Sequence, residues 1–163
     1  MPDSLTSRRS LLHRLFITGT VTTVVDGLCA SLLNSAVFDT TPERMFQGIV
    51  ATLLGRGAFD GGTSAAFFGV MMNAATAFFW SAFFVLAVMR IGRVRTLLAS
   101  RKGILTVAAV YGPFIWLVMS LAVIPLLLHR PPVIGERWVV QLFVHIPFVS
   151  VPLVAVASRG VKK

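Results

Sequence analysis

Five polar side chains interrupt the long apolar runs of this 163-residue chain: Asp26, Asn34, Asn73, Gln141 and His145. A carboxyl group and an imidazole can take up or release a proton, and the three amides can donate and accept hydrogen bonds beside them. These residue types suit a proton-titratable centre or a small polar cavity for transport or ligand binding. They suit equally well polar contacts that fix the register of packed helices. Both interpretations stay open at this point.

The glycine-rich stretch LLGRGAFDGGTS, residues 53–64, is a second candidate. Glycine-exposed amides at the start of a helix, next to an arginine, predict an anion or lipid-headgroup site. That site comprises Arg56, Gly57, Asp60, Gly61 and Gly62. The alternative is a structural hairpin whose glycines let one helix pack closely on the next. A nucleotide-binding loop is not expected, because no lysine follows as in GxxxxGK[ST] and Asp60 replaces the last glycine of GxGxxG.

The composition indicates that a membrane surrounds these residues. Hydrophobic residues make up 56% of the chain and charged residues 13%, with a mean hydropathy of +0.83, whereas soluble domains are roughly 25% charged. The formal net charge is +9, yet the cations occur in short clusters between uncharged runs and not on one stripe. We therefore expect the lipid bilayer, and no nucleic acid, as a partner. The single cysteine, Cys29, offers neither an intrachain disulfide nor a metal cluster, so we expect no metal and no cofactor.

Four segments are apolar enough to cross about 30 Å of hydrocarbon, which takes roughly 20 residues of helix. They are residues 15–38, 63–89, 103–128 and 138–157. Asp26 lies in the first segment and His145 in the fourth. The second and third segments carry no charged residue. Trp138 begins the fourth segment, where an interfacial aromatic residue is expected.

Lysine and arginine alternate between the connecting segments. The two tails, 1–14 and 158–163, and the second loop hold 11 of them, whereas the first and third loops hold 4. The positive-inside rule therefore predicts N-in and C-in topology, in a bacterial inner membrane. Arg8 and Arg9 resemble an export signal, but the run after them is as long as a full span and lacks a small-residue cleavage site. We therefore retain this run as the first span.

Residues 42–55 predict a short amphipathic helix before the second span. Apolar residues recur there in pairs every four positions, and Thr40 or Thr41 can cap a helix that has Pro42 and Glu43 in its first turn. This helix is too short to span and is expected in the outer interface. Its end is expected at Gly55 and Gly57, with Asp60 or Thr63 capping the second span.

Small residues at a spacing of four predict which helix faces meet. The second span has one such face, made of Ala65, Gly69, Asn73, Ala77 and Ser81. The first span has two adjacent faces. One is made of Gly19, Thr23, Gly27, Ser31 and Ser35, and the other of Thr18, Thr22, Asp26, Ala30 and Asn34. We expect these faces to pack together, which pairs Asp26 with Asn73 at depths that differ by about 3 Å. The opposite side of the second span is expected to face lipid or fill gaps with Phe67, Phe78, Phe79, Phe83 and Phe84.

The depths of the five polar residues predict that they converge in the outer half of the bundle, with Gln141 one turn above His145.

Prolines in the last two spans predict kinks: Gly112 with Pro113 is expected to break the third span, and Pro125, Pro147 and Pro152 also interrupt helices.

Three segments carry a resemblance to a known family: TTPERMFQGIVATLLGRGAFDGGTSAAFFG, then YGPFIWLVM with IPLLL, then QLFVHIPFVSVPLVAVASR. The chain from about Gly19 to Arg159 resembles small, uncharacterised bacterial inner-membrane proteins with four spans. Members of that family often carry histidine at the position of Asn73. The resemblance implies the four-span topology and implies no activity.

These observations predict an all-α integral membrane protein: a four-transmembrane-helix bundle, residues 15–157, with a short outer interfacial helix. The expected function is a non-enzymatic membrane component that binds lipid or partner proteins, including a second copy. The alternative is a proton-linked small permease or channel centred on Asp26. A third hypothesis, a lipid-modifying or quinone-handling enzyme, depends on Arg56, Asp60 and His145.

Overall fold

The computed structural model describes residues 3–129, 131–159 and 161, and they form an all-helical chain without a strand among them. The first and second long units are α1 (Asp3–Phe38) and α3 (Gly62–Leu86), the latter followed by the 3-10 turn η2 (Val88–Arg90). The third unit is α5 (Arg101–Val118), the π turn η3 (Met119–Val123) and α6 (Ile124–Leu128). The fourth is α7 (Glu136–His145), the π turn η4 (Ile146–Ser150) and α8 (Val151–Ala157). The short elements are α2 (Pro42–Leu54), the 3-10 turn η1 (Gly55–Asp60) and α4 (Gly92–Leu97).

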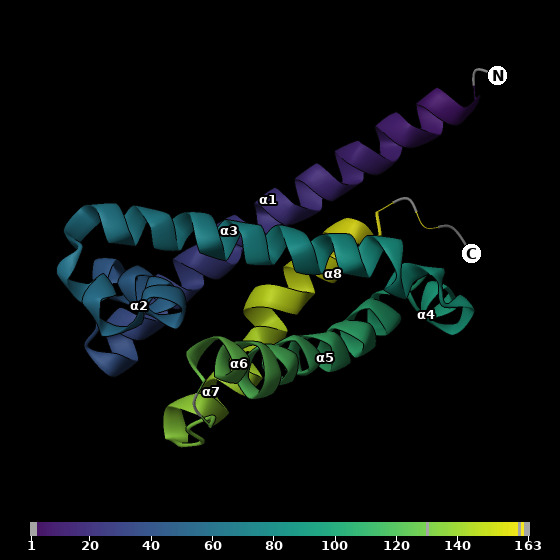
Figure 1. The fold of residues 1–163 in the computed structure, drawn as a ribbon. Helices are drawn as coiled ribbons and strands as arrows, with labels where there is room; N and C mark the ends of the chain where they lie inside the picture. The colour runs from purple at the N-terminus through teal and green to yellow at the C-terminus, as the bar shows by residue number, and fades with distance from the viewer. Residues whose placement is uncertain (1–2, 130, 160, 162–163) are drawn as a thin grey trace.

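Each long unit contains a segment of sufficient length and hydropathy to cross a membrane, so the predicted fold class is confirmed. These segments are Ser10–Phe38, Gly62–Arg90, Arg101–Leu128 and Glu136–Ala157. Helix α1 begins at Asp3, inside the segment predicted as a tail, and its 36 residues span roughly 54 Å at 1.5 Å each. Its N-terminal part extends beyond the other helices (Figure 1). Some of the basic residues counted in the alternation between connecting segments lie outside the described residues: Arg130, Lys162 and Lys163. The side chains of Arg8 and Arg9 also lie outside them.

The ends of the bundle alternate as four crossings require. Both termini lie at the same end as α4, while α2, α6 and the start of α7 lie at the opposite end (Figure 1). Arg93, Arg95 and Arg101 belong to the α4 end, in or directly after that short helix. The basic second loop and the two termini are therefore on one side of the molecule.

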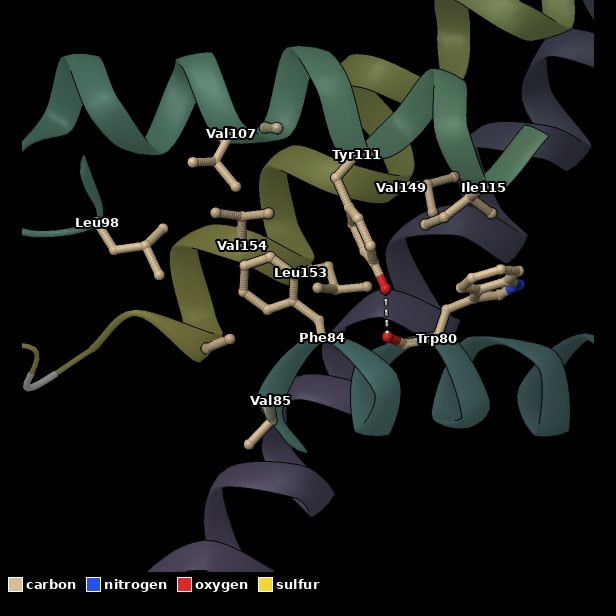
Figure 2. Packing of buried hydrophobic residues seen from close by; sticks show 12 residues of the cluster. Trp80, Phe84, Val85, Leu98, Val107, Tyr111, Ile115, Val149, Leu153 and Val154 are labelled. Atoms are coloured by element: carbon tan, nitrogen blue, oxygen red, sulfur yellow. Dashed lines mark hydrogen bonds between the residues drawn. The ribbon is translucent and has the colours of Figure 1, made fainter. Parts of the chain in front are cut away.

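A cluster of buried hydrophobic residues joins α3, α5 and α8 (Figure 2). Phe84 and Leu153 are fully buried there, and the Tyr111 hydroxyl donates a hydrogen bond of 2.7 Å to the backbone carbonyl of Trp80. The hydroxyl of Ser150 in η4 donates to the Ala108 carbonyl of α5 at 2.6 Å. Phe84 thus fills a gap between helices, whereas Phe67 and Phe79 are exposed on the outside of α3.

The small-residue faces of α1 and α3 meet only in part. Around the middle of the interface, a Cβ built on Gly27 would lie 3.7 Å from Nδ2 of Asn73, which matches the prediction. Further along, Gly19 packs on the ring of Phe78, a residue assigned to the opposite side of α3. The prediction is wrong for Gly69, whose position touches the backbone carbonyl of Phe46 in α2. Helix α2 folds back onto α3 and covers the part of this face around Gly69, which α1 was expected to occupy.

Helix α2 begins as predicted, because the Thr41 hydroxyl accepts a hydrogen bond of 3.2 Å from the Arg44 amide. The predicted cap of the second span is wrong. Gly61 caps α3 without a side-chain bond, because Asp60 still belongs to η1 and Thr63 already lies inside α3. The Thr63 hydroxyl donates instead to Glu43 of α2 at 3.3 Å.

The prolines shape the last two spans only partly as predicted. Helix α5 continues through Gly112 and Pro113 up to Val118, so the expected break is absent there. Membrane helices tolerate a proline where neighbouring groups stabilise the backbone, and Gly112 packs directly on the His145 carbonyl and the Ser150 hydroxyl. The irregular backbone is instead in η3, just before Pro125, and in η4, which contains Pro147. Pro147 has no N–H to donate to the fourth residue before it, which disfavours a regular α turn.

Candidate functional site

The candidate site is centred on Asp26, in the middle of the membrane-spanning part of α1. The Asn73 side chain of α3 donates a hydrogen bond to the Asp26 carboxyl group. Both residues are half-buried, and they lie at the crossing where Gly27 lets α3 approach α1. The pair is therefore held by close helix packing as well as by its own hydrogen bond.

On the other side of Asp26 lies a cavity of about 10 Å³, between α1 and the fourth span. Asp26, Cys29 and Ala30 line it from α1, and Gln141 and His145 line it from α7. A volume of this size has room for about one water molecule. Three of the five polar residues thus share one cavity, and Asn73 is bonded to one of them.

The ring of His145 has a defined orientation. Its Nδ1 lies 2.6 Å from the Gln141 carbonyl oxygen, which can only accept, so Nδ1 carries a proton and donates. This contact leaves Nε2 as the nitrogen that is free to accept a hydrogen bond or a proton. The ring also packs against Trp116 of α5, with centroids 4.8 Å apart. Contacts within α7 and with α5 therefore fix the position of this imidazole.

Asn34 does not join the cavity. It lies about two turns further out on α1, is 3% exposed, and donates from Nδ2 to the Ala30 carbonyl at 2.8 Å. Its Oδ1 accepts a hydrogen bond from Arg137 at the start of α7, and the Arg137 guanidinium also lies 4.5 Å from the ring centre of Phe38. Arg137 thus links the C-terminal end of α1 to the start of α7.

Sequence reasoning counted Arg137 only as a loop charge and missed this contact. The signal was its position, because Arg137 precedes Trp138 at the outer end of one span while Asn34 and Phe38 lie at the outer end of another. An arginine in such a place can satisfy a buried amide on a neighbouring helix and stack on an aromatic ring.

The glycine-rich turn has the geometry of the structural alternative. The Gly61 amide donates to the Ala58 carbonyl at 3.4 Å, and the Gly62 carbonyl accepts from Gln47 of α2 at 3.0 Å. Gly55 and Gly62 have φ values of 68° and 55°, which favour glycine. Arg56 and Asp60 are exposed. The anion site comprising Arg56, Gly57, Asp60, Gly61 and Gly62 stays a prediction.

A second and larger space opens between α3 and the third span. This groove has a volume of about 470 Å³ and is lined by Ala75, Thr76, Phe79 and Trp80 of α3 and by Val118, Met119 and Val123. The Thr76 hydroxyl donates within its own helix to the Met72 carbonyl, so the lining is essentially apolar. Periodicity alone did not predict the groove, because η3 supplies two of its residues and sets its wall.

No protein-family model, curated protein or solved structure matches this chain. The proposed four-span family therefore remains a prediction from the quoted segments. In the described part of the chain, no group of three or more histidine, cysteine, aspartate or glutamate side chains is arranged to hold a metal ion.

Proposed function

We propose that this protein is a non-enzymatic, multi-pass membrane component that binds lipid, with an acyl chain lying in the groove between α3 and the third span. The observation that carries the proposal is the groove itself: about 470 Å³ in volume, open at the side and almost entirely apolar. Such a surface favours hydrocarbon over water. A binding site of this size is also in the range of small-molecule pockets.

The depth of the groove favours an acyl chain over a headgroup as its occupant. Ala75 is 13 positions after Gly62, or roughly 20 Å from the start of α3 at 1.5 Å per residue. Because the hydrocarbon layer is about 30 Å thick, this position lies within it. Lipid tails are the apolar molecules that surround a protein at that depth.

The proposal includes a bacterial inner membrane, with both termini and α4 in the cytoplasm. Its support is the clustering of Arg93, Arg95 and Arg101 in the second loop and the basic residues of the two tails. Positive charge concentrates on the cytoplasmic side of inner-membrane proteins.

A test compares lipid retention by the wild type, Ala75→Trp and Ala109→Trp. Both alanines are exposed, but Ala75 lines the groove and Ala109 lies on α5 away from it. In native mass spectrometry of protein from nanodiscs, we expect bound lipid on the wild type and on Ala109→Trp, and a several-fold loss on Ala75→Trp. Wild type without retained lipid, or equal retention by both variants, would contradict the proposal. A dimer that only Ala75→Trp abolishes would assign the groove to a second copy.

A proton-linked permease or channel is the second candidate, favoured by the polar cavity that Asp26, Gln141 and His145 line within the membrane. Ionisable residues at such depth often belong to proton or solute pathways. Proton and solute flux into liposomes, measured for the wild type and Asp26→Asn, tests it. A permease or channel of this kind would show flux in the wild type that the substitution abolishes. Equal flux in both proteins, or none in either, would exclude this role.

A further inference from the structure

Asp26 and His145 line the same small cavity from two different helices. The other polar or titratable groups around them are Asn73, which bonds Asp26 from α3, and Gln141 and Cys29 on the cavity walls. The nearest cation along α7, Arg137, is engaged by Asn34 and Phe38 further out. Within the described residues that line the cavity, the carboxyl and the imidazole are therefore the pair best placed to balance each other's charge.

Charge balance limits how many protons this pair can hold. A single uncompensated charge in the middle of a membrane helix is energetically costly. With one proton, the pair is neutral overall, either as a protonated carboxyl with a neutral imidazole or as a carboxylate with an imidazolium. A second proton leaves a net positive charge, and the loss of the first leaves a net negative charge. The environment therefore favours a single proton on the two groups.

The cavity has polar side chains on both walls, among apolar ones, and it is large enough for one water. A buried water needs a volume of roughly 10–15 Å³ and two to four polar partners, and the cavity measures about 10 Å³. The Asp26 carboxyl, the Gln141 amide and the His145 ring supply the partners. The bond from Nδ1 to the Gln141 carbonyl leaves Nε2 for the water.

We propose that this cavity binds a single water molecule that bridges Asp26 to Nε2 of His145, and that the two side chains share one proton through it. When the proton passes, the carboxyl O–H bond breaks as a new O–H bond forms on the water. At the same time an O–H bond of that water breaks and an N–H bond forms at Nε2. Water and total charge are conserved, and the reverse transfer restores the first state.

The bridging water does not depend on the lipid groove. It occupies the same cavity as the second candidate function, but it requires only local proton sharing and no flux across the membrane. A protein without transport activity can hold this water, and a transporter can lack it. The two hypotheses therefore fail on different measurements.

Solid-state NMR of the full chain in lipid bilayers tests the proposal. His13→Gln and His129→Gln, both at exposed positions, leave His145 as the source of imidazole nitrogen signals. We expect a protonated Nδ1 and transfer of magnetisation from water to Nε2. Ala30→Val, which adds two methyl groups at the cavity wall, is expected to reduce this transfer several-fold. The matched control Ala36→Val, at an exposed position of α1, is expected to leave it unchanged.

Asp26→Asn completes the experiment. The shared proton is lost in this variant, so the Nε2 resonance is expected to move while Nδ1 stays protonated. If no magnetisation passes from water to Nε2 in the protein with the unsubstituted cavity, the proposal of a bound water is overturned. This outcome does not depend on the folding of a cavity variant. Transfer that Ala30→Val does not reduce also overturns the bound water. If the Nε2 resonance does not move in Asp26→Asn, the proposal of a shared proton is overturned.

Discussion

Gly112 determines how closely the third span approaches the candidate site. A Cβ at this position would lie 2.7 Å from both the His145 carbonyl oxygen and the Ser150 hydroxyl. Because glycine leaves that space free, α5 contacts η4 directly and Ser150 can donate to the Ala108 carbonyl. The same contact supports the backbone of His145, whose ring lines the polar cavity. One missing methyl group therefore affects both the helix packing and the site.

We expect Gly112→Ala to lower the free energy of unfolding by about 1–3 kcal/mol, the usual range for overpacking a tight interface. The matched control is Gly48→Ala in α2, where an added Cβ would meet no atom within 4 Å. Helix propensity alone predicts that the control is neutral or stabilising. Unfolding in mixed detergent micelles measures both changes. Equal stabilities of the two variants would contradict the packing described for Gly112.

Residue types and depth were sufficient to predict part of the site. The approach of Asp26 to Asn73 and to His145 follows from counting positions along helices of known rise, and the structure brings these residues together. Asn34 was placed in the same cluster, but a specific bond to Arg137 holds it further out. Counting positions along a helix gives the level of a residue in the bundle. It does not identify which neighbouring residue forms a hydrogen bond with its side chain.

At the scale of elements, helix α2 is attached to α3 by a close backbone contact. The Phe46 carbonyl of α2 occupies the space that a side chain at Gly69 would need, and the Gln47 side chain donates to the Gly62 carbonyl. The amphipathic pattern and Thr41 predicted α2 itself. Its packing on α3 was expected only under the structural alternative for the glycine-rich stretch. The small face of α3 was assigned to α1, because small residues alone fit either α1 or α2. The π turns were missed for a similar reason, since proline positions indicate an irregular backbone without specifying its geometry.

Gly69→Val is expected to displace α2 from α3. The branched side chain cannot fit against the Phe46 carbonyl, so the two helices must separate. Hydrogen exchange of the α2 amides should then accelerate by at least tenfold, while α5 amides, which are remote from this contact, keep their wild-type rates. Exchange in nanodiscs followed by mass spectrometry measures both. Unchanged exchange in α2 would contradict the docking of this helix on α3.

Helices α3 and α5 are linked beside the apolar groove by the bond from Tyr111 to the Trp80 carbonyl. Tyr111→Phe removes this bond and keeps the aromatic packing against Phe84. We expect a loss of about 0.6 kcal/mol, the average for interhelical hydrogen bonds in membranes. Reversible unfolding in detergent measures it, with Tyr111→Leu as the comparison that also removes the ring. A larger loss of unfolding free energy for Tyr111→Phe than for Tyr111→Leu would be inconsistent with this contact.

At the scale of the whole molecule, hydropathy and charge predicted the architecture because the bilayer limits the choices. Only helices of about 20 apolar residues satisfy their backbone within hydrocarbon, and the four predicted segments correspond to the four long helical units. Both termini and α4 share one end of the bundle (Figure 1). The polar cavity lies between the first and fourth spans, and the apolar groove lies between the second and third.

Cysteine accessibility tests this central claim most directly. In a Cys29→Ser background, single cysteines replace Arg95 in α4 and Ser64 at the start of α3, both at exposed positions. With a membrane-impermeant reagent added to intact spheroplasts, we predict that Ser64→Cys is labelled and that Arg95→Cys is labelled only after the membrane is opened. Labelling of both positions from the same side would contradict the four-span arrangement and, with it, the depths assigned to the groove and the cavity.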